Sequence, residues 1–189
     1  VNRTVCRPGV PQFDSPYAPP CVLKWSGNNG GDTAPGVTGS TITVSENRFT
    51  DNSTVIAAGE LFPGALPSAD ALQSDTQTFV NYLNTQYELY GRKVVVKPYE
   101  PKGNLIQELV GQDSQGAAED AQTAKSLGAF ADVTVINAQM YQQDLVGQRI
   151  LSFNTFYPDQ GFMKSSLPYA YSTPFPTGQQ AGQGLGTVA

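Results

Sequence analysis

The clearest pattern of secondary structure lies in residues 68–99, SADALQSDTQTFVNYLNTQYELYGRKVVVKPY. Over residues 68–90 apolar side chains recur at spacings of three and four, which predicts one long amphipathic helix with Ser68 as its N-cap. Gly91 ends this predicted helix, and the β-branched run that follows predicts a strand over residues 93–99. A helix that leads through a glycine into a short apolar strand is half of a βαβ unit, from which parallel sheets are built.

The rest of the sequence predicts further strands and helices in alternation. Residues 41–44 alternate with period two and form the first strand, and residues 133–136 and 150–153 are short apolar strands. The Ala-rich segment 115–127 and the segment 140–148 are the helices that precede these last two strands. Right-handed crossovers join this order of elements into a three-layer α/β/α sandwich whose parallel strands lie in the order 2-1-3-4.

Composition divides the chain into three parts. Residues 1–35 form an irregular leader rich in Pro and Gly, residues 36–175 hold the α/β elements, and residues 176–189 begin a further helix. The leader contains both cysteines of the chain, Cys6 and Cys21. A disulfide between them would stabilise this core-poor segment by roughly 3 kcal/mol. Two unrelated thiols are the alternative, but the segment favours a disulfide and therefore an oxidising compartment.

Several function classes are disfavoured by composition. The net charge of −5 over 189 residues offers no basic footprint, so we expect no nucleic-acid partner. The chain has no histidine, which removes histidine-based catalysis and imidazole metal sites, and it has no Gly-x-Ser-x-Gly elbow. We therefore expect no enzymatic activity, no metal and no cofactor. The adjacent Glu119 and Asp120 are interpreted as a solvated helix edge. Asn2 and Asn52 begin glycosylation sequons, which matter only in a eukaryotic secretory host.

A known family shares the order of several short segments in this chain. They are CRPGV (6–10), YAPPC (17–21), GNNGG (27–31), GVTGSTITV (36–44), YELYGRKV (87–94), ILSFN (150–154) and QQA (179–181). In this order and spacing they resemble the first part of the type I periplasmic-binding-protein family. That family includes secreted actinobacterial solute-binding proteins, such as the branched-chain amino acid receptors of ABC importers.

The resemblance implies a role in uptake or sensing outside the cell. Family members have two lobes with a ligand cleft between them, so residues 36–175 would be an incomplete N-terminal lobe. The implied ligand is a small polar molecule such as an amino acid or an amide. The implied partners are membrane importer subunits and a second lobe, and the implied location is extracellular or at the cell envelope, with a lipid anchor before processing.

The candidate ligand site lies beyond the carboxyl ends of the parallel strands, at the switch point between the first and third strands. Residues 45–47 end the first strand. The groups that follow the third and fourth strands would offer backbone N–H groups, polar side chains and an aromatic wall. The candidate ligand-binding residues are Asn137, Ala138, Gln139, Asn154, Thr155, Phe156 and Tyr157. The alternative is that the Asn, Gln and Thr side chains only cap strands and helices.

A structural or assembly protein is the rival interpretation. Under it, the strand at 150–153 is an exposed sheet edge that a partner chain completes. Gly178, Gly182 and Gly186 would form a smooth helix face at spacings of four, suited to a second lobe or to self-association.

Overall fold

Four parallel strands form the centre of this computed structural model, which describes residues 10, 11, 18, 20–49, 67–153 and 159–172. Within these residues the strands make one sheet in the order β2-β1-β3-β4. Their bounds are β1 Thr41–Asn47, β2 Lys93–Tyr99, β3 Ala131–Asp132 and β4 Leu151–Ser152. The parallel sheet and its strand order confirm the predicted α/β class.

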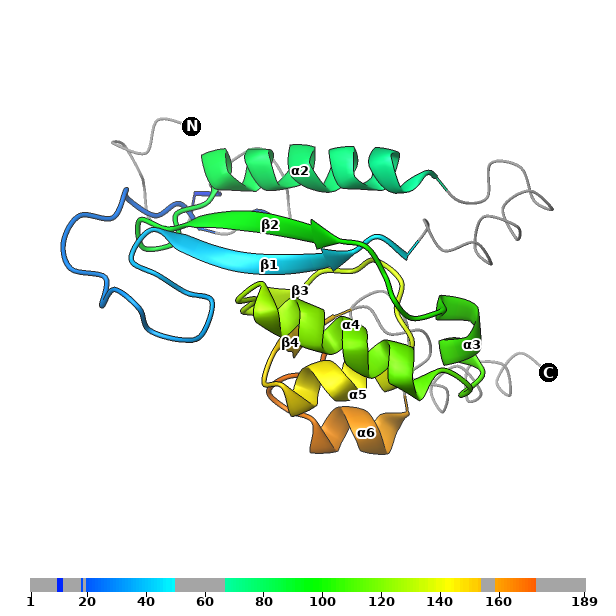
Figure 1. Ribbon diagram of the computed structural model, residues 1–189. Coiled ribbons are helices and arrows are strands. Elements are labelled where there is room, and N and C mark those ends of the chain that lie inside the picture. Colours follow the sequence, from blue (N-terminus) through cyan, green and yellow to red (C-terminus); the bar gives the residue numbers. More distant parts are fainter. Residues whose placement is uncertain (1–9, 12–17, 19, 50–66, 154–158, 173–189) are drawn as a thin grey trace, which may run out of the picture.

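Helices cover both faces of the sheet (Figure 1). Helix α2 lies on one face, where its Thr76 hydroxyl donates to Glu46 of β1 at 2.6 Å. Helices α4 and α5 lie on the other face, where Asn47, the next residue of β1, donates to Asp120 of α4. Successive residues of a strand point to opposite faces of its sheet. The two contacts therefore place α2 and α4 on opposite faces, with the sheet as the middle of three layers. The helices are α2 Ala69–Gln86, α3 Leu105–Leu109, α4 Ser114–Ser126, α5 Gln139–Gly147 and α6 Gln160–Ser165.

The main apolar core lies between the sheet and the α4–α5 pair. Ala117, Ala121 and Ala124 are fully buried along one side of α4, so small side chains let this helix approach its neighbours closely. Leu145 of α5 and Ile150, just before β4, pack into the same cluster. The predicted Ala-rich helix at 115–127 is thereby confirmed to within one residue, because its pattern of small side chains matches its buried face.

The joint between α2 and β2 differs from the prediction. Helix α2 ends at Gln86, and Tyr87 already has extended backbone angles. Leu89 pairs with Arg92 across a tight turn whose two central residues, Tyr90 and Gly91, have φ values of 55° and 78°. The prediction that the helix runs to residue 90 was therefore wrong. Gly91 serves the turn, where a positive φ is required, and not the helix end.

Asn84 of α2 covers the free edge of β2. Its Nδ2 donates to the Val94 carbonyl at 2.9 Å, and its Oδ1 accepts from the Val94 N–H at 2.8 Å. The side-chain amide thus takes the place of a further strand at this edge, where unpaired backbone groups otherwise invite association.

Replacing Asn84 with alanine is expected to lower the free energy of unfolding by about 1–2 kcal/mol, because two partly buried backbone groups lose their partner. Urea denaturation followed by circular dichroism measures this change. Asn81→Ala is the matched control on the same helix, since Asn81 is exposed and its side-chain oxygen accepts from Gln77. Equal stability of the two variants would contradict the role of Asn84.

Strand β3 forms two residues earlier than its apolar run predicts. The prediction placed it at residues 133–136, but Ala131 and Asp132 make the ladder, and Val135 is 45% exposed. The Phe130 N–H donates to the Thr43 carbonyl and the Val133 N–H to the Ser45 carbonyl, which sets the register against β1. Hydrogen bonds to the buried Asp132 side chain outweigh the apolar character of the run that follows.

The outer edge of β4 is covered by the chain itself. The Ser152 N–H donates to the Tyr169 carbonyl at 2.7 Å, and the Tyr171 N–H donates to the Ser152 carbonyl at 2.9 Å. The expectation of an exposed edge at residues 150–153 was therefore wrong. No periodic pattern of apolar residues predicted this covering segment or α6, which precedes it.

The described part of the leader is irregular, as predicted. The Cys21 N–H donates to the Val10 carbonyl at 2.9 Å and Pro11 pairs with Pro20, so the two arms of the leader meet. No cysteine is a free thiol among the described residues. Cys6 lies outside them, and its pairing with Cys21 stays a prediction. Asn2, Asn52, Gly178, Gly182 and Gly186 also lie outside the described residues.

None of the helices in the described ranges combines the length and the apolar character that a membrane span requires.

Candidate functional site

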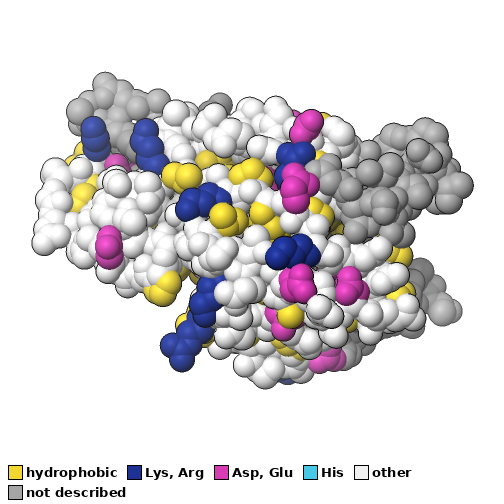
Figure 2. Space-filling model, in the orientation of Figure 1, with side chains coloured by type: hydrophobic (Ala, Val, Ile, Leu, Met, Phe, Trp, Pro, Cys, Tyr) yellow, Lys and Arg dark blue, Asp and Glu magenta, His cyan; other side chains and the backbone are white. Residues whose placement is uncertain are grey.

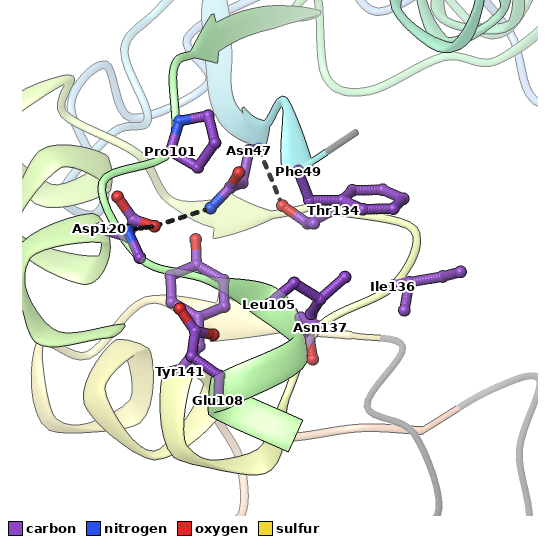
Figure 3. A pocket seen from close by; sticks show the side chains of 11 residues that line it. Asn47, Phe49, Pro101, Leu105, Glu108, Asp120, Thr134, Ile136, Asn137 and Tyr141 are labelled. Atoms are coloured by element: carbon purple, nitrogen blue, oxygen red, sulfur yellow. Dashed lines mark hydrogen bonds between the residues drawn. The ribbon is translucent and has the colours of Figure 1, made fainter. Parts of the chain in front are cut away.

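Polar side chains meet where β1 and β3 end. Asn47 is the last residue of β1, and its backbone N–H donates to the Thr134 hydroxyl, two residues after β3, at 2.9 Å. The Asn47 side chain points to the α4 face of the sheet, and its Nδ2 donates to Asp120 Oδ2 at 3.1 Å (Figure 3). This is the switch point of the sheet, since β2 lies on one side of β1 and β3 on the other.

Asp120 anchors the loop between β2 and α3. Its carboxylate accepts from the backbone N–H groups of Lys102 at 2.8 Å and Gly103 at 3.2 Å, and the residue is only 1% exposed. Burial raises the pKa of Asp120, and these hydrogen bonds and the Lys102 charge oppose that rise. The interpretation of Asp120 as part of a solvated helix edge was wrong, because the side chain faces the loop.

Glu108 brings a second carboxyl group to the same place. It lies in α3, is 7% exposed, and packs so closely on Gly103 that a Cβ there would meet its Oε1 at 2.1 Å. Burial, then the charges of Asp120, Asp113 and Asp144, raises the pKa of Glu108 to about 7. This carboxyl group therefore changes its charge near neutral pH.

A second polar network lies deeper, centred on Asp132 of β3. This side chain is fully buried and accepts from the Ser45 hydroxyl at 2.7 Å, the Tyr141 hydroxyl at 3.0 Å and the Thr134 N–H at 3.1 Å. The Tyr141 and Tyr99 hydroxyls are hydrogen-bonded to each other at 2.5 Å. Burial raises the pKa of Asp132, and these hydrogen bonds oppose that rise. The network ties β1, β2, β3 and α5 together at the base of the site.

A small hollow opens above these groups. The centre of a water-sized particle can move within about 10 Å³ of it, so the hollow has room for one such particle. Figure 3 shows Asn47, Asp120, Glu108 and Tyr141 on one side of it. Phe49, Leu105 and Ile136 lie on the other side and form an apolar wall. The Asn47 Oδ1 atom is buried and has no hydrogen-bond partner within the described part of the chain.

One of the predicted ligand-binding residues lines this hollow. Asn137 is 2% exposed, contributes to the lining, and donates to the Phe153 carbonyl at 2.9 Å. Ala138 is fully buried and begins α5 without a side-chain cap. Gln139 is engaged elsewhere, because its Oε1 accepts from the Asp159 N–H at 2.8 Å at the start of α6. Asn154, Thr155, Phe156 and Tyr157 lie outside the described residues.

Most of the lining residues escaped prediction as site residues, among them the polar Glu108, Asp120, Thr134 and Tyr141. For Asp120 a signal was present, because it stands three residues after Ala117 and four before Ala124, on the buried face of α4. A carboxylate at such a position needs hydrogen-bond partners inside the protein. The position of Glu108 depends on α3, a five-residue helix without a periodic signal.

Charged side chains outside the hollow are distributed over the described surface. On the face in Figure 2, Lys and Arg side chains are spread out, and some of them stand beside Asp or Glu. Across the described ranges, no three acidic, cysteine or histidine side chains are grouped so as to hold a metal ion.

The chain matches no known family model, no curated protein sequence and no solved structure.

Proposed function

We propose that this chain is a non-catalytic, extracellular solute-binding unit that holds a small polar molecule at the carboxyl ends of β1 and β3. The observation that carries the proposal is the convergence of polar side chains from three helices and two strand ends on one hollow at the switch point of a parallel sheet. Ligands of open α/β sheets bind in this place.

The chemistry of the lining favours an amino acid or an amide. Amide, hydroxyl and carboxyl groups of Asn47, Tyr141 and Glu108 stand opposite an apolar wall. The hollow admits one polar group, so the remainder of a solute would lie outward across the strand ends. Uptake or sensing would then need importer subunits and a second lobe, as the resemblance to periplasmic-binding proteins implies.

The rival interpretation as an assembly protein loses its main argument. It required an open sheet edge at β4, and residues 169–171 cover that edge through two backbone hydrogen bonds to Ser152. Asn84 in turn covers the backbone of Val94 on the opposite edge.

Titration calorimetry of the folded chain against a panel of amino acids and carboxamides tests the proposal. We expect heat from at least one solute, and a rise in melting temperature of about 5 °C when that solute is present at about 100 times its Kd. Asn47→Ala is expected to weaken binding about 10-fold, since it removes a lining amide. Gln77→Ala on the exposed side of α2 is the control and should leave binding unchanged. The absence of heat for every member of the panel would overturn the proposal.

A further inference from the structure

We infer that the hollow between Asn47, Asp120 and Glu108 is a seat for a primary ammonium group. The inference deepens the proposed function and rests on it, because it names the part of the solute that this site would hold. The ammonium group can belong to an organic amine or be the free ammonium ion, and the experiment below separates these two sources.

The first observation is the unpartnered oxygen of Asn47. Asn47 is 9% exposed, and its Nδ2 is fixed by the hydrogen bond to Asp120. The opposite amide orientation would set Oδ1 against the Asp120 carboxylate, so Oδ1 must face away from that carboxylate. A buried carbonyl oxygen without a donor costs about 1–3 kcal/mol. A group that donates a hydrogen bond to this oxygen would remove that cost.

The second observation is the sign of the charge around the hollow. Two carboxyl groups, Asp120 and Glu108, line it, and no Lys or Arg side chain is part of its lining among the described residues. Asp113 and Asp144 add negative charge near Glu108, and the Lys102 charge acts on Asp120 from the loop. A water molecule would satisfy Asn47 Oδ1 alone, whereas an ammonium group would also compensate this excess of negative charge.

The size of the hollow limits which cations can enter it. Space of about 10 Å³ for a particle centre admits one group the size of water, which an ammonium group matches. A quaternary ammonium group, which carries four carbon substituents and no N–H donor, neither fits nor donates to Asn47. Primary amines and ammonium itself are therefore the expected occupants.

Binding is expected to strengthen as the pH rises from 6 to 8. Glu108 has a pKa of about 7, and only its ionised form attracts a cation. The groups that face Glu108 are the acidic Asp120, Asp113 and Asp144, which favour its neutral form until a cation arrives. A bound ammonium group lowers the pKa of Glu108 and so releases a proton.

The experiment compares matched probes on the full chain at pH 8 in sodium phosphate. Ammonium chloride, tetramethylammonium chloride and sodium chloride are titrated at equal ionic strength, and each solute that binds is compared with its analogue lacking the amino group. We expect ammonium or the amine to raise the melting temperature above the sodium chloride control, whereas tetramethylammonium does not. Glu108→Gln should weaken this binding about 10-fold or more, and Glu119→Gln, an exposed carboxylate of α4, should not.

Two results would overturn the inference: equal effects of ammonium and tetramethylammonium, or binding that Glu108→Gln and pH leave unchanged. Either would mean that the hollow holds a water molecule only. The pH profile of the unaltered chain keeps the test decisive if Glu108→Gln does not fold. Binding of deaminated solutes alone would leave the proposed function standing and end this inference. If free ammonium binds and no organic solute does, the ammonium seat stands and the proposed function falls.

Discussion

Replacing Asp132 with leucine is expected to lower the free energy of unfolding by about 3 kcal/mol or more. The Ser45 hydroxyl, the Tyr141 hydroxyl and the Thr134 N–H all donate to this fully buried carboxyl group, and each would lose its acceptor. A buried donor without a partner costs about 1–3 kcal/mol. Urea denaturation at fixed pH, followed by circular dichroism, measures the loss.

Asp132→Asn is the matched control for this prediction. It keeps the shape of the side chain and one carbonyl oxygen, and the Ser45 and Tyr141 hydroxyls can turn to accept from its amide. We expect a loss of no more than about half that of the leucine variant. If the leucine variant were as stable as the unaltered chain, the network would not be what holds β3 against β1.

The free energy of unfolding is expected to fall as the pH rises from 4.5 to 8. Burial raises the pKa values of Glu46, Glu108, Asp120 and Asp132, so over this range the folded state binds more protons than the unfolded state. The stabilisation is complete below the unfolded pKa values and is lost as the pH passes the folded ones. For Glu108 the change from 4.5 to about 7 corresponds to about 2 kcal/mol after allowance for solvent screening.

Glu108→Gln tests the pH prediction directly. Since glutamine does not ionise, the variant should lose less stability than the unaltered chain between pH 5 and 8. Glu119→Gln should keep the original slope, because its carboxylate is exposed on α4. Denaturation curves at several pH values in a buffer without amines measure the slopes. A stability that rises with pH over this range would contradict the upward shift that burial gives to the pKa values of these carboxyl groups.

Much of the fold was predictable because its determinants are local. The Ala-rich pattern of α4, the Ser68 cap of α2, whose hydroxyl oxygen accepts from the Ala71 N–H, and the alternation in β1 each lie within a short stretch. Consecutive parallel strands tend to lie side by side with right-handed crossovers, which favours the observed strand order. The end of α2 was misjudged because Gly91 suits both a helix end and a tight turn, and Tyr90 gave no sign that it would adopt a positive φ.

Most of the site was not predictable, because long-range contacts determine it. Asn47 and Asp120 are 73 residues apart in sequence, as the hydrogen bond between their side chains shows. The apolar run at 133–136 misplaced β3, since hydrogen bonds from Ser45 and Tyr141 to Asp132 decide which residues enter the sheet. The strand-end rule pointed to the region in which the hollow lies, and Asn137 is the predicted residue that lines the hollow.

NMR mapping on the isotope-labelled chain would locate the solute-binding site residue by residue. A solute that binds is expected to shift the amide resonances of Asn47, Gly103, Thr134 and Asn137, which surround the hollow at the ends of β1 and β3. The resonances of Gln77 and Asn81, on the exposed side of α2, should stay in place. Shifts confined to residues away from the ends of β1 and β3, or no shifts with any solute of the panel, would contradict the account.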